Sequence, residues 1–388
     1  MIRPNGEVTA APNGEEGRTD DGSDPALYEG EHSLVNDRRP CLITGGAGFI
    51  GTNLAQRLLS LGRRVILLDN LSRPGVRRNV AWLRHRFGTQ VELEQGDVRD
   101  PAILQRLVRR VSHVFHFAAQ VAVTTSIADP VTDFEVNARG TLNLLEAVRA
   151  CEQPPPLLFT STNKVYGSLN DLEMVTLPKR YEPADRHLRE EGFAPGALDL
   201  YSPYGCSKGA ADQYVLDYAR TYHIPTIVFR MSCIYGAHQF GTEDQGWVAH
   251  FLIRAMAGEP IKIYGDGRQV RDVLYVDDLI DAMLLAQANA PRLSGRAFNI
   301  GGGPERTLSL LELIHLIEEM GISTGDVSFE DWRVGDQRYY VSSIEAFAEA
   351  VGWEPRVSLR EGIRRLHAWL NGQHEQVELS TEQGGRSA

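Results

Sequence analysis

Short apolar runs alternate with amphipathic segments along most of the chain. The runs occupy residues 41–44, 65–69, 91–97, 114–119, 156–162 and 226–230. Because apolar residues fill consecutive positions in these runs, both faces of each predicted strand should be buried, as in a parallel sheet. Between the runs, Ile50, Leu54 and Leu58 recur at helical spacing, and segment 137–150 has the same pattern. Strands that alternate with helices predict a doubly wound α/β domain.

The regular alternation of apolar runs and amphipathic segments ends after Arg230. Gly-rich turns, a helical segment at Trp247 and an isolated apolar helix over residues 308–320 replace the regular alternation. We therefore predict a sheet domain over residues 39–235, to which residues 272–300 return. A smaller C-terminal lobe is predicted over residues 236–271 and 301–372. A ligand would bind between the two, outside the carboxyl ends of the strands.

Both ends of the chain lack this pattern. Residues 1–38 hold nine acidic and three basic residues and almost no apolar periodicity. Such a segment buries too little apolar surface to offset its ordering entropy, so we predict a disordered acidic tail. A regulatory or partner-binding tail is the alternative. Residues 373–388 are predicted to be a flexible C-terminus for the same reason.

Composition and spacing argue against several classes of function. The net charge of −11 disfavours a nucleic-acid partner, since such proteins usually carry a basic face. The chain has no run of about 18 apolar residues that would predict a membrane span. The N-terminus also lacks the apolar stretch of a signal peptide. The four cysteines have neither metal-ligand nor redox spacing, so we expect no bound metal and a reducing, cytoplasmic location.

A glycine-rich string, TGGAGFIG, occupies residues 44–51, directly after the first apolar run. Gly45 would allow a tight turn, Gly48 a close approach of backbone to a pyrophosphate, and Gly51 close packing of helix on sheet. Phe49 and Ile50 open the following helix, whose N-terminal amides and dipole favour an anion. The glycine spacing alone is a weak signal. Its place between a strand and an amphipathic helix predicts a Rossmann-type dinucleotide site.

The second apolar run ends in Asp69, 18 residues beyond Gly51. A carboxylate there can accept hydrogen bonds from ribose hydroxyls and would repel a 2′-phosphate, which favours NAD over NADP. Arg73 argues the other way, since an arginine can hold that phosphate, and a simple turn residue is a further alternative for Asp69. We also expect cofactor contacts from Asn70, Ser72, Arg73, Asp97, Val98, Ala118, Ala119 and Gln120. Tight packing explains the two alanines equally well.

Tyr204 and Lys208 form a YxxxK motif. Residues four apart share a helix face, and a nearby ammonium favours the phenolate, so we expect a lowered tyrosine pKa suited to acid–base catalysis. Both residues are expected to contact the cofactor as well, Lys208 through the nicotinamide ribose. The hydroxyl of Thr162, at the end of an apolar run, could hold a substrate oxygen against Tyr204. For the neighbouring Ser161 we favour helix capping.

These motifs, in this order, resemble the extended short-chain dehydrogenase/reductase family over about residues 39–370. Longer strings resemble the CDP-tyvelose 2-epimerase (CDP-paratose 2-epimerase) group within it: DNLSRPGVRRN, STNKVYG, SPYGCSKGAADQY, FGTEDQGWVAHF and GDQRYYVSS. The resemblance implies retained NAD, a nucleotide-sugar substrate, and Thr162, Tyr204 and Lys208 as the catalytic set. It implies inversion of carbon 2 of a hexose through a transient 2-keto intermediate. It also implies a homodimer or homotetramer built through helices of the cofactor domain.

The two positions after Thr162 depart from the dehydratases of this family, which carry an acid pair there. Asn163 and Lys164 cannot act as that general acid and base, so 4,6-dehydration is rejected. Guanidinium groups bind phosphate as a bidentate fork, which suits the diphosphate of a nucleotide sugar. Substrate contacts are therefore expected from Asn163, Trp247, His250, Arg268 and Arg338, with Arg271 a weaker candidate. Surface salt bridges for the arginines and core packing for the tryptophan are the alternatives.

Other activities stay open at this point. The first is a 4-epimerase of UDP- or GDP-sugars with the same fold, whose motifs would look similar. A net oxidoreductase or decarboxylase is the next, and it would release NADH, which an epimerase does not. A non-catalytic dinucleotide-binding sensor could dispense with the proton-transfer pair, yet Tyr204 and Lys208 are both present.

Overall fold

The computed structural model describes residues 37–384, with side chains described for residues 37–372. The predicted tail, residues 1–38, therefore lies almost entirely outside the described residues, as do residues 385–388. Within the described chain, seven parallel strands form one sheet in the order β3-β2-β1-β4-β5-β8-β12. These strands are β1 (Cys41–Thr44), β2 (Val65–Asp69), β3 (Val91–Gln95), β4 (His113–His116), β5 (Leu157–Thr162), β8 (Thr226–Met231) and β12 (Arg296–Ile300).

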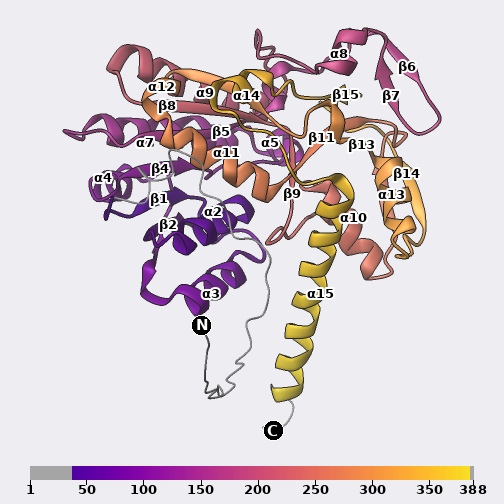
Figure 1. Cartoon of the computed structure of the whole chain (residues 1–388), viewed down its shortest axis with the longest axis horizontal. Coiled ribbons are helices and arrows are strands. Elements are labelled where there is room, and N and C mark those ends of the chain that lie inside the picture. The colour runs from indigo at the N-terminus through magenta and orange to yellow at the C-terminus, as the bar shows by residue number, and fades with distance from the viewer. Residues whose placement is uncertain (1–36, 385–388) are drawn as a thin grey trace, which may run out of the picture.

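The strands of this sheet are buried on both faces, as the apolar runs predicted. In β1, Ile43 packs into one apolar cluster and Leu42 into the other, and Leu67 and Ile66 alternate in the same way in β2. Helices cover both faces (Figure 1), which confirms the predicted doubly wound α/β fold. One cluster includes α2 (Phe49–Ser60), α3 (Val76–Phe87) and α11 (Val276–Ala288), and the other α4 (Pro101–Val108), α7 (Gly140–Arg149) and α9 (Ser202–Tyr222).

Strand order reverses direction at β1, which pairs with β2 on one side and β4 on the other. The chain leaves β1 and β4 toward opposite sides of the sheet, so their carboxyl ends open a crevice. Short elements after β4 and β5 border this crevice. They are α5 (Val123–Ala128), α6 (Pro130–Phe134), a π-helical turn (Glu135–Arg139) and a 3₁₀ turn (Asn163–Tyr166).

Smaller sheets follow in the second half of the chain. The strand β11 (Val270–Tyr275) pairs with β9 (Cys233–Tyr235), β13 (Thr307–Ser309) and β15 (Tyr339–Tyr340). The strand β10 (Ile261–Tyr264) pairs with β14 (Val327–Glu330), and β6 (Met174–Thr176) pairs with β7 (Tyr181–Pro183). Figure 1 shows α10 (Trp247–Met256), α13 (Leu310–Glu319) and β14 together, at the end of the molecule away from α4 and α7. The predicted residue bounds of the two lobes stay an interpretation.

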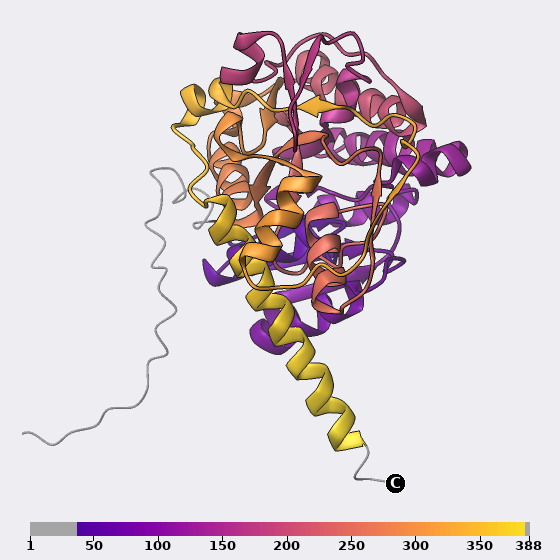
Figure 2. The same cartoon turned by 90° about the vertical axis from the view of Figure 1, so that its right-hand side faces the viewer.

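The remaining elements connect or extend these layers. They are a 3₁₀ turn (Gly88–Gln90), α8 (Arg186–Glu190), α12 (Ala290–Leu293), a 3₁₀ turn (Pro304–Arg306), α14 (Glu345–Val351) and α15 (Leu359–Gly384). The C-terminal part of α15 projects beyond the rest of the molecule (Figure 2). Its backbone is helical across most of segment 373–388, and the flexibility expected of that segment stays a prediction.

A buried ion pair joins α9 to the sheet. Arg230 on β8 donates from Nε and Nη2 to the two carboxylate oxygens of Asp212 on α9, both at 2.9 Å. The side chains are only 6% and 0% exposed. Arg230 also donates to the hydroxyl of Tyr166, which in turn donates to Asn299 on β12. One guanidinium therefore ties a helix, two strands and the turn after β5 together.

Replacing the arginine of this pair should destabilise the fold strongly. Arg230→Leu leaves the Asp212 carboxylate buried without its ionic partner, so we expect the free energy of unfolding to fall by about 3–5 kcal/mol. Urea denaturation measures this loss. The matched control is Arg149→Leu, which breaks an exposed pair with Glu146 and should change the free energy of unfolding far less. Equal losses in the two variants would contradict a structural role for the buried pair.

Candidate active site

A cavity of about 890 Å³ opens at the carboxyl ends of β1, β2, β4 and β5. Its far wall comes from α10, β10, β11 and the segment 333–336, so both parts of the fold contribute to it. The volume lies in the range of small-molecule sites, and the place is the one expected for a doubly wound sheet. Two of the residues proposed from the sequence, Arg268 and Arg338, do not line it. All the others do.

The glycine-rich turn forms one end of the cavity. Gly45 has φ +67°, and a Cβ there would lie 2.8 Å from the amide nitrogen of Ala118. A Cβ on Gly51 would lie 2.5 Å from the carbonyl oxygen of Gly45, so any side chain would push α2 away from the sheet. Gly48 precedes α2 and provides no side-chain cap, which leaves the first amides of the helix to a ligand. Free amides and the helix dipole suit the pyrophosphate of a dinucleotide.

Asp69 stabilises this turn from the end of β2. Its two oxygens accept hydrogen bonds from the backbone amides of Ala47, at 3.0 Å, and Leu71, at 2.8 Å. Burial raises the pKa of the Asp69 carboxyl, and the two backbone hydrogen bonds act against that rise. Arg73 lies close enough to lower the same pKa, and it lines the cavity together with Asn70 and Ser72. Asp69, which favours NAD, and Arg73, which would favour NADP, therefore lie close together at the same end of the cavity.

The third and fourth strands supply the next part of the wall. Asp97 receives two hydrogen bonds from the Arg99 side chain and one from Asn70, and the arginine holds the pKa of its carboxyl far below the usual range. Val98 lies beside it, and Ala118 and Ala119 follow β4. These small side chains take up little space at the edge of the cavity. Gln120 instead donates to Asp133, at 2.8 Å.

The proposed catalytic residues meet at the middle of the cavity. Thr162 ends β5, and its side chain lies close enough to the Tyr204 phenol to lower the pKa of that group. Lys208 lies one helical turn after Tyr204 on α9 and donates to the carbonyl oxygen of Thr160, at 2.7 Å. Its ammonium also lies 4.1 Å from the centre of the Phe159 ring. The structure therefore brings the three residues together, and their chemical roles stay a proposal.

The pKa expected for Tyr204 needs correction. The sequence argument predicted a lowered value because of Lys208, whereas burial raises the pKa of Tyr204 to about 12, with only a partial offset from Thr162 and then Arg73. Burial likewise lowers the pKa of Lys208 to about 7. Both groups lose water in the cavity wall, which disfavours their charged forms. Helical spacing predicts that two residues share a face, but it does not predict how deeply they are buried.

A polar network behind α9 holds Tyr204 and Lys208 in place. The amide of Tyr204 donates to Ser126 on α5, at 3.1 Å. Ser207 accepts a hydrogen bond from Asn137, at 3.0 Å, and the same Asn137 side chain donates to Asp133. Asn137 lies in the π-helical turn, where the extra residue turns its side chain toward α9. Neither Asn137 nor Asp133 was proposed from the sequence, because their partners are distant in the chain.

Two of the three arginines predicted to bind phosphate lie outside the cavity. Arg268 pairs with Asp266 and donates to the carbonyl of Pro178, while the guanidinium of Arg338 stacks on aromatic rings, and neither lines the cavity. Arg271, the weaker candidate, does line the cavity and is buried. Arg271 is the second residue of β11, whereas Arg268 lies in the preceding turn.

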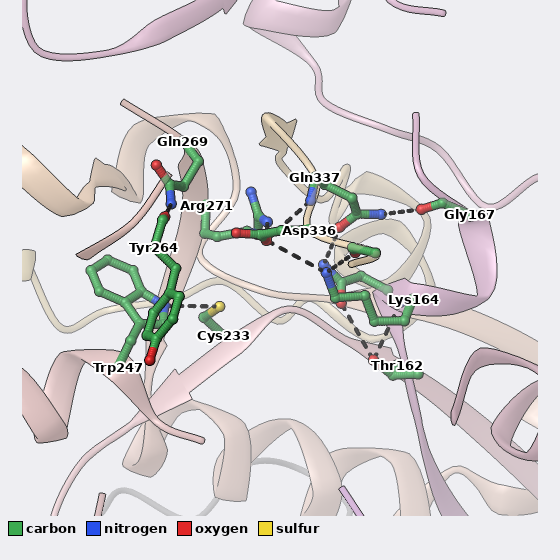
Figure 3. A network of polar contacts seen from close by, with 12 residues as sticks. Thr162, Lys164, Gly167, Cys233, Trp247, Tyr264, Gln269, Arg271, Asp336 and Gln337 are labelled. Carbon is green, nitrogen blue, oxygen red and sulfur yellow. Dashed lines mark hydrogen bonds and ion pairs between the residues drawn. The ribbon is translucent and has the colours of Figure 1, made fainter. Parts of the chain in front are cut away.

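Two further cations, not proposed from the sequence, line the same wall. Arg333 donates to Glu243, lies 3.4 Å from Asp244 and stacks 3.8 Å from the Tyr264 ring centre. Lys164 follows Thr162 by two residues and faces Arg271 across Asp336 (Figure 3). Asn163, Trp247 and His250, all expected from the sequence, complete this side of the cavity. Burial lowers the pKa of His250.

The described residues contain no group of three or more His, Cys, Asp or Glu side chains that could hold a metal ion. In the same part of the chain, no helix is long and apolar enough to cross a membrane. The four cysteines are free.

Comparison with known proteins places these features in a family. Residues 41–301 match the NAD dependent epimerase/dehydratase family. The chain is 44% identical over 340 residues to a CDP-paratose 2-epimerase from Salmonella typhi, an alignment that covers 85% of this chain and 98% of that protein.

Solved structures agree with this match. The UDP-glucose 4-epimerase of Thermus thermophilus, in complex with NAD, superposes with a TM-score of 0.70 at 34% identity, covering 86% of this chain and 99% of that one. DesIV, a dTDP-glucose 4,6-dehydratase from Streptomyces venezuelae with NAD bound, gives 0.72 at 28% identity, covering 87% and 98%. The chain therefore belongs to the NAD dependent epimerase/dehydratase family of nucleotide-sugar enzymes, as its motifs predicted.

Proposed function

We propose that this protein is an NAD-dependent 2-epimerase of a CDP-activated hexose. The observation that carries the proposal is the 44% identity to a CDP-paratose 2-epimerase across nearly its full length. The site supports it, because Thr162, Tyr204 and Lys208 meet in the cavity while Asn163 and Lys164 follow the first of them. An amide and an amine at those two positions do not supply the acid pair that a dehydratase needs.

The residues of the site suit a reversible sugar oxidation. NAD supplies a hydride acceptor that can return the hydride to the same carbon. Tyr204 takes the proton from the hydroxyl at carbon 2 and gives one back when the hydroxyl re-forms. Thr162, beside the phenol, holds the reacting oxygen within reach of Tyr204. Lys208 lies on the same helix face as Tyr204. When its amine is protonated, its positive charge favours the phenolate form of Tyr204 over the phenol.

Arg271 and Arg333 are the proposed diphosphate ligands. Both line the cavity on the wall opposite the glycine-rich turn, and a guanidinium can bind a phosphate through two parallel hydrogen bonds. The negatively charged part of the substrate would then be held away from the cofactor pyrophosphate, which the N-terminus of α2 suits. With both ends anchored in this way, the sugar lies between them, next to Thr162 and Tyr204.

A 4-epimerase of another nucleotide sugar is the second candidate. It is favoured by the similarity to the UDP-glucose 4-epimerase of Thermus thermophilus, which is 34% identical and of which this chain covers 99%. The same proton-transfer set would serve both reactions. The two differ in which carbon of the sugar faces Tyr204.

Removing the phenol hydroxyl should abolish most of the activity. Tyr204→Phe is expected to lower turnover by about 10²–10⁴-fold, the usual contribution of a general acid–base group. The bound NAD content, read by absorbance after denaturation, should stay unchanged. Tyr222→Phe, near the exposed end of the same helix, is the matched control and should keep full turnover. Normal turnover of Tyr204→Phe would remove this residue from the mechanism.

The substrate and the reacting carbon can be identified together. CDP-, GDP-, UDP- and dTDP-hexoses are incubated with the protein in deuterated water and followed by proton NMR. We expect a CDP-sugar to be inverted at carbon 2 without deuterium at that carbon, because the hydride returns from the cofactor rather than from solvent. Inversion at carbon 4 would support the second candidate. Deuterium at carbon 2 would indicate direct deprotonation and contradict the proposal.

We further propose that the protein forms a homodimer through α5, α6 and α9. These helices pack together and expose large apolar side chains, which soluble monomers rarely gather in one place. The residues are Ile127, Val131, Phe134 and Tyr214, each at least 45% exposed. A second copy of the same helices would cover them around a two-fold axis. The cytoplasmic location likewise stays a proposal.

A charge in this apolar patch should prevent association. Val131 is 70% exposed, so Val131→Glu is tolerated by the monomer but leaves an unpaired carboxylate in the dimer. Light scattering after gel filtration should give an oligomer for the unmodified protein and a monomer for the variant. Val175→Glu, on the exposed hairpin strand β6, is the control and should leave the mass unchanged. A monomeric unmodified protein would refute the proposed interface.

A further inference from the structure

Lys164 occupies a position between the proton-transfer set and the proposed phosphate ligands. Its backbone amide donates to the hydroxyl oxygen of Thr162, at 3.3 Å. On its other side, a Cβ built on Gly205 would lie 3.2 Å from its carbonyl oxygen, which places Lys164 against the first turn of α9 beside Tyr204. The side chain lines the cavity and is 20% exposed. Lys164 is therefore fixed relative to the reacting oxygen through its main chain.

The ammonium of Lys164 is held in one direction by acceptors across the cavity. Its Nζ donates to the carbonyl oxygen of Gly335, at 3.1 Å, and lies 3.9 Å from a carboxylate oxygen of Asp336. Arg271 donates to that same oxygen, at 2.7 Å (Figure 3). The Lys164 amine therefore points from the end of β5 toward the segment 333–336, which also contains Arg333.

Charge is not balanced at this point of the cavity. Lys164 and Arg271 share the single carboxylate of Asp336, whereas Arg333 has both Glu243 and Asp244 beside it. Burial and then the repulsion from Arg271 lower the pKa of Lys164 to about 8, which Asp336 only partly offsets. Arg271 is buried and Lys164 is partly buried, so two cations that share one anion here favour a further negative group close by. A phosphate of the substrate has the required charge and acceptor oxygens.

The bonding within the sugar indicates which of the two phosphates of the substrate would lie beside Lys164. Carbon 2 is bonded directly to the anomeric carbon that carries the phosphate, whereas carbon 4 lies across the ring from it. When carbon 2 is next to Tyr204, the sugar-linked phosphate must therefore lie close to Thr162, where Lys164 is fixed. With carbon 4 next to Tyr204, the same phosphate would lie farther off, at the arginines alone.

We propose that Lys164 binds the sugar-linked phosphate and thereby places carbon 2 of the hexose beside Tyr204. This inference rests on the proposed function and adds the residue that selects the carbon. In this role Lys164 is a substrate ligand, and Tyr204 alone transfers the proton. The position that holds an acid in the dehydratases then carries a cation here because the phosphate lies nearer to the reacting carbon.

The test compares CDP with CMP, which lacks the second phosphate, by calorimetric titration of the full-length protein. For Lys164→Met we expect the affinity for CDP to fall by about 10- to 100-fold, the usual effect of losing a charge-assisted hydrogen bond, while the affinity for CMP stays unchanged. Lys164→Arg keeps the charge and should retain most of the advantage of CDP over CMP. Lys179→Met, an exposed lysine outside the cavity, is the matched control for the loss of one charge.

Each outcome decides one part of the inference. Equal weakening of CDP and CMP, or no weakening of either, would overturn the phosphate contact. Weaker CDP binding with an unchanged kcat at saturating substrate would overturn the placement of carbon 2. If the unmodified protein prefers UDP, GDP or dTDP, the proposed CDP specificity fails, and the matching diphosphate and monophosphate then test Lys164 in the same way.

Discussion

The site depends on the ion pair between Arg230 and Asp212, because that pair fixes α9 to the sheet. The helix carries both Tyr204 and Lys208. Besides single hydrogen bonds such as that from Lys208 to a backbone carbonyl of β5, it packs on the strands through apolar side chains, whose contacts are weakly directional. A bidentate pair has a defined geometry, so it sets the rotation and the axial position of α9 relative to β5 and β8. Thr162 at the end of β5 then lies beside the Tyr204 phenol.

Burial determines how the proton-transfer residues behave. Tyr204 and Lys208 lie in a wall with little water, so the pKa of the phenol is raised and that of the ammonium lowered. A phenol with a high pKa does not readily lose its proton, and it needs a neighbouring positive charge to do so. The nicotinamide ring of oxidised NAD carries such a charge. In the proposed mechanism, proton transfer by Tyr204 would therefore be coupled to the oxidised state of the cofactor.

The sequence predicted the sheet well, and the residues that it proposed for the cofactor all line the cavity. Strands with apolar residues on both faces are typical of a parallel sheet, and a glycine turn between strand and helix indicates where a dinucleotide fits. The arginines that line the cavity were harder to predict. Arg268 and Arg271 are three residues apart, and only the tertiary pairing with Asp266 turns one away while β11 directs the other into the cavity. Arg333 lies in a loop that carries no periodic pattern at all.

The shared carboxylate of Asp336 has a consequence for the stability of the whole protein. Two cations on one acid repel each other in the folded chain, and this repulsion contributes an unfavourable term to folding. A bound anion removes that term, and a ligand that binds only the folded chain stabilises it by about 2.7 kcal/mol at a concentration of 100 times its Kd. With the substrate phosphate as that anion, as proposed, thermodynamic linkage makes the resistance of this protein to unfolding rise with the concentration of its nucleotide-sugar ligand.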